Sequence, residues 1–145
     1  MVDYVADSYA AVVRYNGGSN AGHTVVVGGT KHTFHLLPSG ALKGKELLIG
    51  AGVAVDPGVL SEELSSLPRQ GGGKLLVDTR CSLVSPFDKE FDGILEESRG
   101  ESSIGTTRRG IGPSYAMRAL RLSPRICDLL RGWTTHPDRG RGSDG

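Results

Sequence analysis

Two glycine-rich stretches carry the residues of this chain that are best suited to chemistry. The first, YNGGSNAGHTVVVGG (residues 15–29), sets Asn20, His23 and Thr24 among glycines. Glycines let backbone N–H groups converge on an anion without a side chain in the way. The three polar side chains are suited to orienting a phosphoryl group or protonating it. A simple turn before a hairpin, with a solvated histidine, explains the same residues.

The second stretch, GTTRRG (residues 105–110), combines two threonine hydroxyls with Arg108 and Arg109 beside flexible backbone. This donor set is typical of phosphate binding, because guanidinium groups match the geometry of a phosphate. A solvated basic turn has the same composition. Two such loops in one small chain favour a phosphorylated ligand without identifying it.

Composition limits the kind of protein to which these loops can belong. The chain has 145 residues, 37% of them hydrophobic, and a formal net charge of +1. We therefore expect one globular domain with no general attraction to nucleic acid or to an anionic membrane. Cys81 and Cys127 are too few for a disulfide framework or a zinc site. The sequence shows no secretory signal and no apolar run approaching about 18 residues, so a cytoplasmic location is expected.

The apolar pattern predicts alternating strands and helices around the two loops, which is an α/β arrangement. Strands are predicted at 10–15, 46–55 and 74–84, and a hairpin at 23–37 with its turn at Gly28-Gly29-Thr30. Helices are predicted at the start (2–8), after the Asp56-Pro57 cap (to about 67), after Ser85-Pro86, and from 114 to 130 with a break at Ser123-Pro124. In the helix after Ser85, the side chains of Phe87, Phe91, Ile94 and Leu95 share one face.

Two long stretches resemble, in the same order, motifs of the adenylosuccinate synthetase family. They are VVRYNGGSNAGHTVVVGGTKHTFHLLPSGAL and IGTTRRGIGPSYAMRALR, and the segments LLIGAGVAVDPGVL and VDTRC between them resemble the family as well. The resemblance covers about residues 2–130. It implies a fragment of a P-loop-NTPase-like mixed sheet flanked by helices. Residues 1–130 would form part of the synthetase domain, and residues 131–145 are expected to be a disordered tail.

The resemblance also implies an activity and the residues that serve it. The family ligates IMP and L-aspartate to adenylosuccinate in AMP biosynthesis, using GTP and Mg²⁺ and passing through 6-phosphoryl-IMP. His23 matches the general acid, and the Gly22 carbonyl matches a Mg²⁺ ligand. The residues that match IMP-binding positions are Asn20, Ala21, Gly22, His23, Thr107 and Arg121, and those that match GTP-binding positions are Gly22, His23 and Thr24. Arg121 matches an arginine that reaches the IMP site of the other subunit, which implies a homodimer.

The chain also departs from the family pattern. It lacks the N-terminal phosphate loop of the form GDEGKGK and the C-terminal guanine-recognition and aspartate-binding regions. Arg108 stands where many members have glycine. We therefore expect the chain alone to be inactive, and its apolar strand 46–55 to lack neighbours in the sheet. A non-catalytic module that binds IMP or phosphate, or a remnant of a damaged gene, is the alternative to a working ligase fragment.

Overall fold

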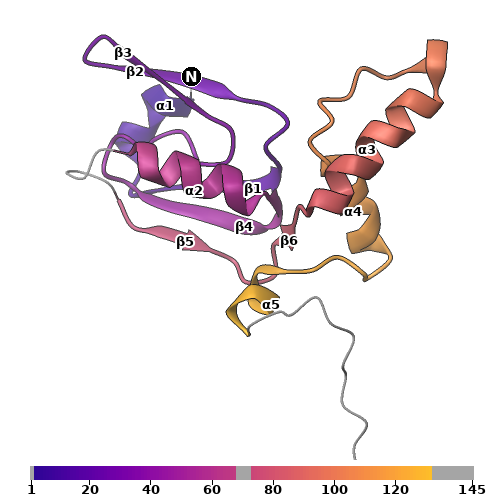
Figure 1. The fold of residues 1–145 in the computed structure, drawn as a ribbon. Coiled ribbons are helices and arrows are strands. Elements are labelled where there is room, and N and C mark those ends of the chain that lie inside the picture. Colours follow the sequence, from indigo (N-terminus) through magenta and orange to yellow (C-terminus); the bar gives the residue numbers. More distant parts are fainter. Residues whose placement is uncertain (1, 68–72, 132–145) are drawn as a thin grey trace, which may run out of the picture.

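The computed structural model describes residues 2–67 and 73–131 as a sheet of parallel strands with helices packed around it (Figure 1). The predicted disordered tail therefore lies outside the described residues, except for Arg131. The described chain begins with α1 (Val2–Val5) and a 3-10 helix, Ala6–Ser8, in agreement with the helix predicted at residues 2–8. Together the elements confirm the predicted α/β fold class.

The strand β4 (Glu46–Val55) is the centre of the main sheet. It pairs in parallel with β1 (Ala11–Gly17) on one side, and with β5 (Leu75–Val77) and β6 (Ser82–Leu83) on the other. Its apolar side chains, among them Leu47, Ile49 and Val53, are buried. The prediction that this strand lacks neighbours is therefore wrong, because the described residues themselves supply a strand along each of its edges.

A separate two-stranded antiparallel sheet, β2 (His23–Val27) and β3 (Thr30–Phe34), confirms the predicted hairpin. Gly28 and Gly29 both have positive φ, 56° and 82°. A two-residue hairpin turn of the primed type requires this conformation, and glycine adopts it without steric cost.

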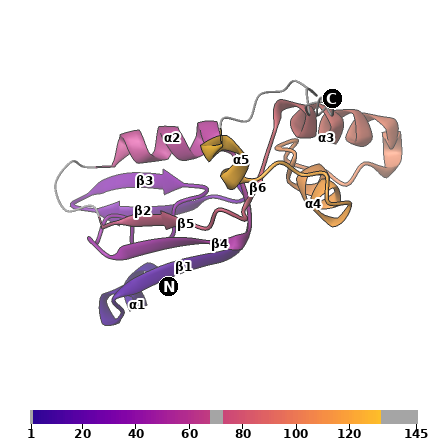
Figure 2. The same cartoon turned by 90° about the horizontal axis from the view of Figure 1, so that it is seen from below.

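The helix α2 (Pro57–Ser66) follows β4 and packs over one face of the sheet (Figures 1 and 2). Asp56 caps it as predicted, since its carboxylate accepts hydrogen bonds from the Gly58 and Val59 N–H groups. Val59 and Leu60 pack against the apolar core, so the N-terminal half of α2 lies over the buried residues of β4.

Residues 74–84 form two short strands and not the single strand that the sequence predicted. The Asp78 carboxylate accepts a hydrogen bond from the Arg80 N–H at 2.8 Å, and the Cys81 N–H donates to the Asp78 carbonyl at 3.0 Å. This turn breaks the pairing. As a result, β5 pairs with residues in the first half of β4, and β6 pairs with the last two residues of β4, Ala54 and Val55.

The helix α3 (Pro86–Ser98) has the predicted capping box between Ser85 and Asp88. Its apolar side chains do share a face, but that face is not the buried one. Phe87 and Ile94 are 57% and 54% exposed. These side chains are exposed because α3 lies with α4 (Ile111–Ala119) beyond the carboxyl end of β4, away from the core of the sheet (Figure 2).

The chain after α3 forms a 3-10 turn, Gly100–Ser102, the second glycine-rich loop, α4, and finally α5 (Ile126–Leu130). The predicted break near Ser123-Pro124 is confirmed, because both residues lie between α4 and α5. No helix among residues 2–67 and 73–131 has the length and apolar character needed to cross a membrane.

Candidate functional site

The first glycine-rich loop leaves the carboxyl end of β1 and is held down by tight packing. A methyl group added at Gly18 would lie 2.5 Å from Cδ1 of Ile111 and 3.0 Å from the Ala54 carbonyl. Arg14 donates to the Gly18 carbonyl at 2.6 Å and also to the His35 carbonyl. Desolvation by burial lowers the pKa of Arg14, which nevertheless stays charged. Glycine at position 18 thus lets the loop approach both β4 and α4.

Tyr115, on α4, ties this loop to the sheet. Its hydroxyl accepts a hydrogen bond from the Gly17 N–H at 2.8 Å and lies 2.8 Å from the Gly52 carbonyl, to which it donates. This hydroxyl therefore joins the two motifs of the family resemblance, since Gly17 lies in the first and Tyr115 in the second. Sequence reasoning missed this residue because a single tyrosine on a helix gives no local sign of a partner at the far end of the chain.

The two motifs line one pocket of about 390 Å³, here called the shared pocket. This volume is within the range of small-molecule sites. Asn20 comes from the first motif and Thr107 from the second, so two of the predicted IMP-binding residues are brought together. The Thr106 hydroxyl is buried and has no hydrogen-bond partner among the described residues. The remaining lining residues are Asp92, Gly105, Ile111, Gly112 and Tyr115.

The second loop contributes fewer phosphate donors than its sequence indicated. The N–H groups of Gly105 and Thr106 already donate to the Glu96 carboxylate on α3. Arg108 pairs with Glu97 at 2.9 Å, and Arg109 lies in a different pocket beside α2. Of the residues in GTTRRG, Gly105, Thr106 and Thr107 line the shared pocket, whereas the two arginines do not.

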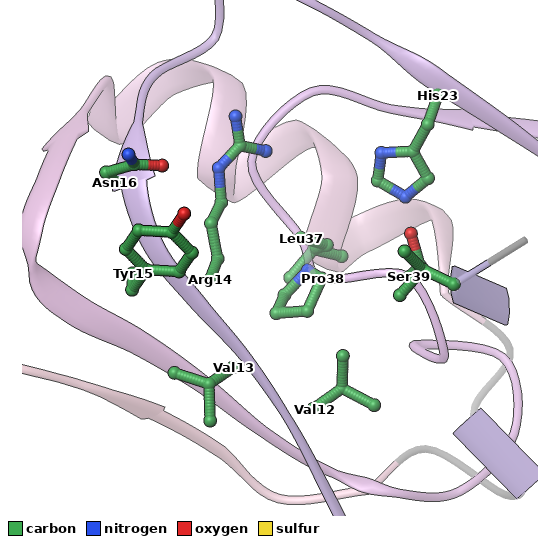
Figure 3. Close-up of a pocket in the computed structure, with 10 residues that line it drawn as sticks. Val12, Val13, Arg14, Tyr15, Asn16, His23, Leu37, Pro38 and Ser39 are labelled. Atoms are coloured by element: carbon green, nitrogen blue, oxygen red, sulfur yellow. The ribbon is translucent and has the colours of Figure 1, made fainter. Parts of the chain in front are cut away.

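His23 begins β2 and faces a second pocket, of about 280 Å³, here called the His23 pocket. Figure 3 shows His23 and Ser39 on one side of it and Arg14, Tyr15 and Asn16 on the other. The predicted acid therefore does not share a pocket with Thr107. The loop that carries Asn20 connects the two pockets along the chain.

The other predicted site residues have varied surroundings. The Thr24 hydroxyl lies 3.2 Å from that of Thr33 across the hairpin. A methyl group added at Gly22 would lie 3.0 Å from Nε2 of His35, so the close approach of that ring favours glycine. Ala21 is exposed.

Arg121 lines neither of these pockets. It is exposed, has a positive φ of 63°, and lines a separate pocket together with Arg125 and Asp128. The structure therefore does not bring Arg121 to the IMP-binding residues of its own chain.

The predicted metal ligand, the Gly22 carbonyl, is a main-chain oxygen and stays a prediction. Within residues 2–67 and 73–131, no group of three His, Cys, Asp or Glu side chains is arranged to hold an ion. A single main-chain carbonyl at Gly22 is not a magnesium site, because Mg²⁺ requires six oxygen ligands in an octahedron. The described side chains alone therefore do not form such a site.

Comparisons with known proteins agree with the two motifs. A family model described as adenylosuccinate synthetase matches residues 1–138. The adenylosuccinate synthetase of Carboxydothermus hydrogenoformans is 47% identical over 133 residues, which are 90% of this chain and 31% of that protein. That of Moorella thermoacetica is 48% identical with the same coverage. The chain thus spans about 31% of the length of these curated relatives.

Solved structures show the same relationship. Fully ligated adenylosuccinate synthetase from Plasmodium falciparum matches with a TM-score of 0.80 and 32% identity, over 88% of this chain and 31% of that one. The succinoaminodeoxyadenylate synthetase of cyanophage S-2L, bound to dGMP and dATP, matches with a TM-score of 0.70 and 26% identity, over 94% and 38%. The fold of this chain is therefore that of a part of these P-loop-type enzymes, and the chain belongs to the adenylosuccinate synthetase family.

Proposed function

We propose that this chain carries the IMP-binding part of an adenylosuccinate synthetase, the GTP-dependent ligase that joins IMP and L-aspartate in AMP biosynthesis. The observation that supports the proposal best is the shared pocket, where Asn20 and Thr107 meet. The 5′-phosphate of IMP would accept a hydrogen bond from the hydroxyl of Thr107. The cyanophage relative binds dGMP, another purine nucleoside monophosphate, which supports a ligand of this class.

The His23 pocket would receive the phosphoryl donor. In this proposal His23 is the general acid that assists departure of GDP, and Gly22 and Thr24 lie beside the GTP phosphates. Arg14 and Asn16, on the opposite wall, add a positive charge and an amide that suit a polyphosphate. The loop 17–22 would then separate the bound IMP from the bound GTP and carry Asn20 to IMP.

Magnesium would accompany GTP in the proposed reaction, where it would neutralise phosphate charge. The Gly22 carbonyl is one hard oxygen that such an ion accepts, and the nucleotide phosphates would have to supply others. We also propose a homodimer in the cytoplasm. The position of Arg121 outside the shared pocket suits a residue that serves the IMP site of a second subunit.

Calorimetry with IMP tests the binding part of the proposal. The 145-residue chain should bind IMP saturably, and Thr107→Ala should weaken binding about tenfold, the usual effect of losing a hydrogen bond to a charged group. Thr79→Ala, at an exposed turn outside both pockets, is the matched control and should bind as wild type does. Absence of saturable binding would contradict the proposal.

Turnover distinguishes a ligase from a binding module. We expect no adenylosuccinate from IMP, GTP and L-aspartate with this chain alone, because the phosphate loop and the aspartate-binding region of the family are not among its 145 residues. Binding without turnover is therefore the expected result. Turnover that is lost in His23→Ala would show that the chain is sufficient for catalysis.

A further inference from the structure

The carboxylate of Glu63 lies inside the protein and binds three consecutive main-chain N–H groups. Glu63 is on α2 and is 6% exposed. It accepts hydrogen bonds from the N–H of His35, from that of Leu36 at 3.1 Å and from that of Leu37 at 2.9 Å. Burying a carboxylate is costly unless hydrogen bonds replace its lost hydration. Successive N–H groups that converge in this way form an anion site, which is here occupied by a charge of the protein itself.

Arg14 binds the other polar group of the His35 backbone. Its guanidinium donates to the carbonyl of His35 and, at 2.6 Å, to the carbonyl of Gly18 in the first glycine-rich loop. A planar guanidinium can bind both carbonyls, because its N–H groups point outward in a fixed fork. Desolvation by burial lowers the pKa of Arg14, and the charge of Glu63 acts in the opposite direction. An anion therefore binds the N–H of His35, and a cation joins its carbonyl to the first loop.

Arg14 and Glu63, here called the clamp, act at the base of the β2–β3 hairpin, which carries His23. The strand β3 ends at Phe34, directly before His35, and Phe34 pairs with His23 across the hairpin. The two rings lie 6.0 Å apart. Phe34 is 1% exposed and belongs to the same core cluster as Leu37. The segment that the clamp binds is therefore continuous with the buried ring beside the His23 imidazole.

We propose that Arg14 and Glu63 are positioning residues, which fix the base of the hairpin against the first glycine-rich loop and so hold the His23 imidazole at the His23 pocket. Glu63 lines neither the His23 pocket nor the shared pocket, so it acts through the backbone of residues 35–37. Arg14 lies on the wall of the His23 pocket opposite the imidazole (Figure 3). The role of His23 as the general acid rests on the proposed function, whereas the clamp does not depend on it.

Amide hydrogen exchange of the unliganded 145-residue chain tests the clamp itself. The N–H groups of residues 35–37 should exchange at least about tenfold more slowly than in an unstructured peptide, since exchange requires opening of their hydrogen bonds. Glu63→Ala should remove most of this protection and leave the amides of β4 protected. Glu63→Gln keeps one acceptor oxygen and should recover part of it. Glu62→Gln, at an exposed position of the same helix, is the matched control.

The NMR signals of the His23 imidazole test positioning. In wild type the neighbouring Phe34 ring should displace these signals from their values in an unstructured peptide. Arg14→Met and Glu63→Ala should each move them most of the way back, because the imidazole then samples several orientations, while circular dichroism shows an unchanged folded fraction. Arg14→Lys keeps the charge and its donors and should stay closer to wild type than Arg14→Met. Arg80→Met, at a side chain that is 71% exposed, is the matched control.

Each result bears on a separate part of the proposal. Wild-type amides of residues 35–37 that exchange as fast as in an unstructured peptide would overturn the clamp. His23 signals that stay at their wild-type positions in folded Arg14→Met and Glu63→Ala would overturn the positioning role, and Arg14→Met decides alone if Glu63→Ala is unfolded. Calorimetry with IMP on the wild-type chain separates these results from the proposed function. Displaced His23 signals in the variants of a chain that does not bind IMP would support the clamp and refute the proposed function.

Discussion

Replacing Tyr115 with phenylalanine removes the hydroxyl that joins the first glycine-rich loop to the sheet. The ring stays in place, so the loss is limited to the hydrogen bonds with the Gly17 N–H and the Gly52 carbonyl, each 2.8 Å long. Removing one partner of a buried hydrogen bond costs about 1–3 kcal/mol. Gly17 and Gly52 are only partly buried, so water can partly replace the lost hydrogen bonds to the Gly17 N–H and the Gly52 carbonyl. We therefore expect the free energy of unfolding to fall by about 1–2 kcal/mol.

Urea unfolding followed by circular dichroism measures this loss. With a slope of about 2 kcal/mol per molar urea, the midpoint should decrease by roughly 0.5–1 M. Tyr15→Phe is the matched control, because it removes a hydroxyl from a side chain that is 73% exposed. If the two variants unfold at the same urea concentration as wild type, then the Tyr115 hydroxyl does not stabilise the junction of the motifs and the reasoning fails.

Three further substitutions test other features. Arg108→Gly should raise the thermal midpoint by a few degrees, because position 108 has a φ of 52° and its ion pair with an exposed glutamate contributes little; a lower midpoint would contradict this. Glu63→Ala should destabilise the chain by about 2–4 kcal/mol in urea unfolding, because the buried Glu63 carboxylate accepts the N–H groups of residues 35–37; an unchanged midpoint would be inconsistent with that role. The hydrogen bond from Arg80 lowers the pKa of Asp78 to about 2. The interaction of Arg80 with the ionised Asp78 therefore stabilises the fold above the ordinary aspartate pKa of about 3.9, and this stabilisation is lost as the pH falls towards 2. In an NMR titration Arg80→Ala should move this pKa back towards the ordinary value, and no movement would count against the pairing.

Features that depend on neighbouring residues could be predicted from the sequence. The Gly28-Gly29 turn, the Asp56-Pro57 cap and the Ser85–Asp88 capping box each involve residues at most three positions apart, and each is confirmed. The break of residues 74–84 into two strands was missed, although Asp78 gave a local signal. An aspartate that accepts from the N–H two residues later is a common turn former.

Features that depend on distant parts of the chain could not be predicted in this way. The direction in which α3 faces follows from the backbone donors of a loop that comes later in the sequence. Periodicity reports only that Phe87 and Ile94 share a face, not whether that face is covered. The burial of Asp92 and Glu96 is therefore invisible to a reading of apolar spacing. It follows from the need of a glycine-rich loop for hydrogen-bond acceptors.

The parallel topology explains why two motifs from opposite halves of the chain meet at one pocket. Carboxyl ends of parallel strands lie at the same edge of a sheet, which is where such folds bind ligands. The first loop begins at the carboxyl end of β1, and α4 packs across that edge. Ile111 contacts the end of β4, and the Ser114 hydroxyl donates to the carbonyl of Leu83 at the end of β6. A one-residue shift in the register of β1 against β4 would separate Gly17 from Tyr115 and turn the loop away from Thr107. The pocket therefore depends on the pairing of β1 with β4 as much as on the loops that line it.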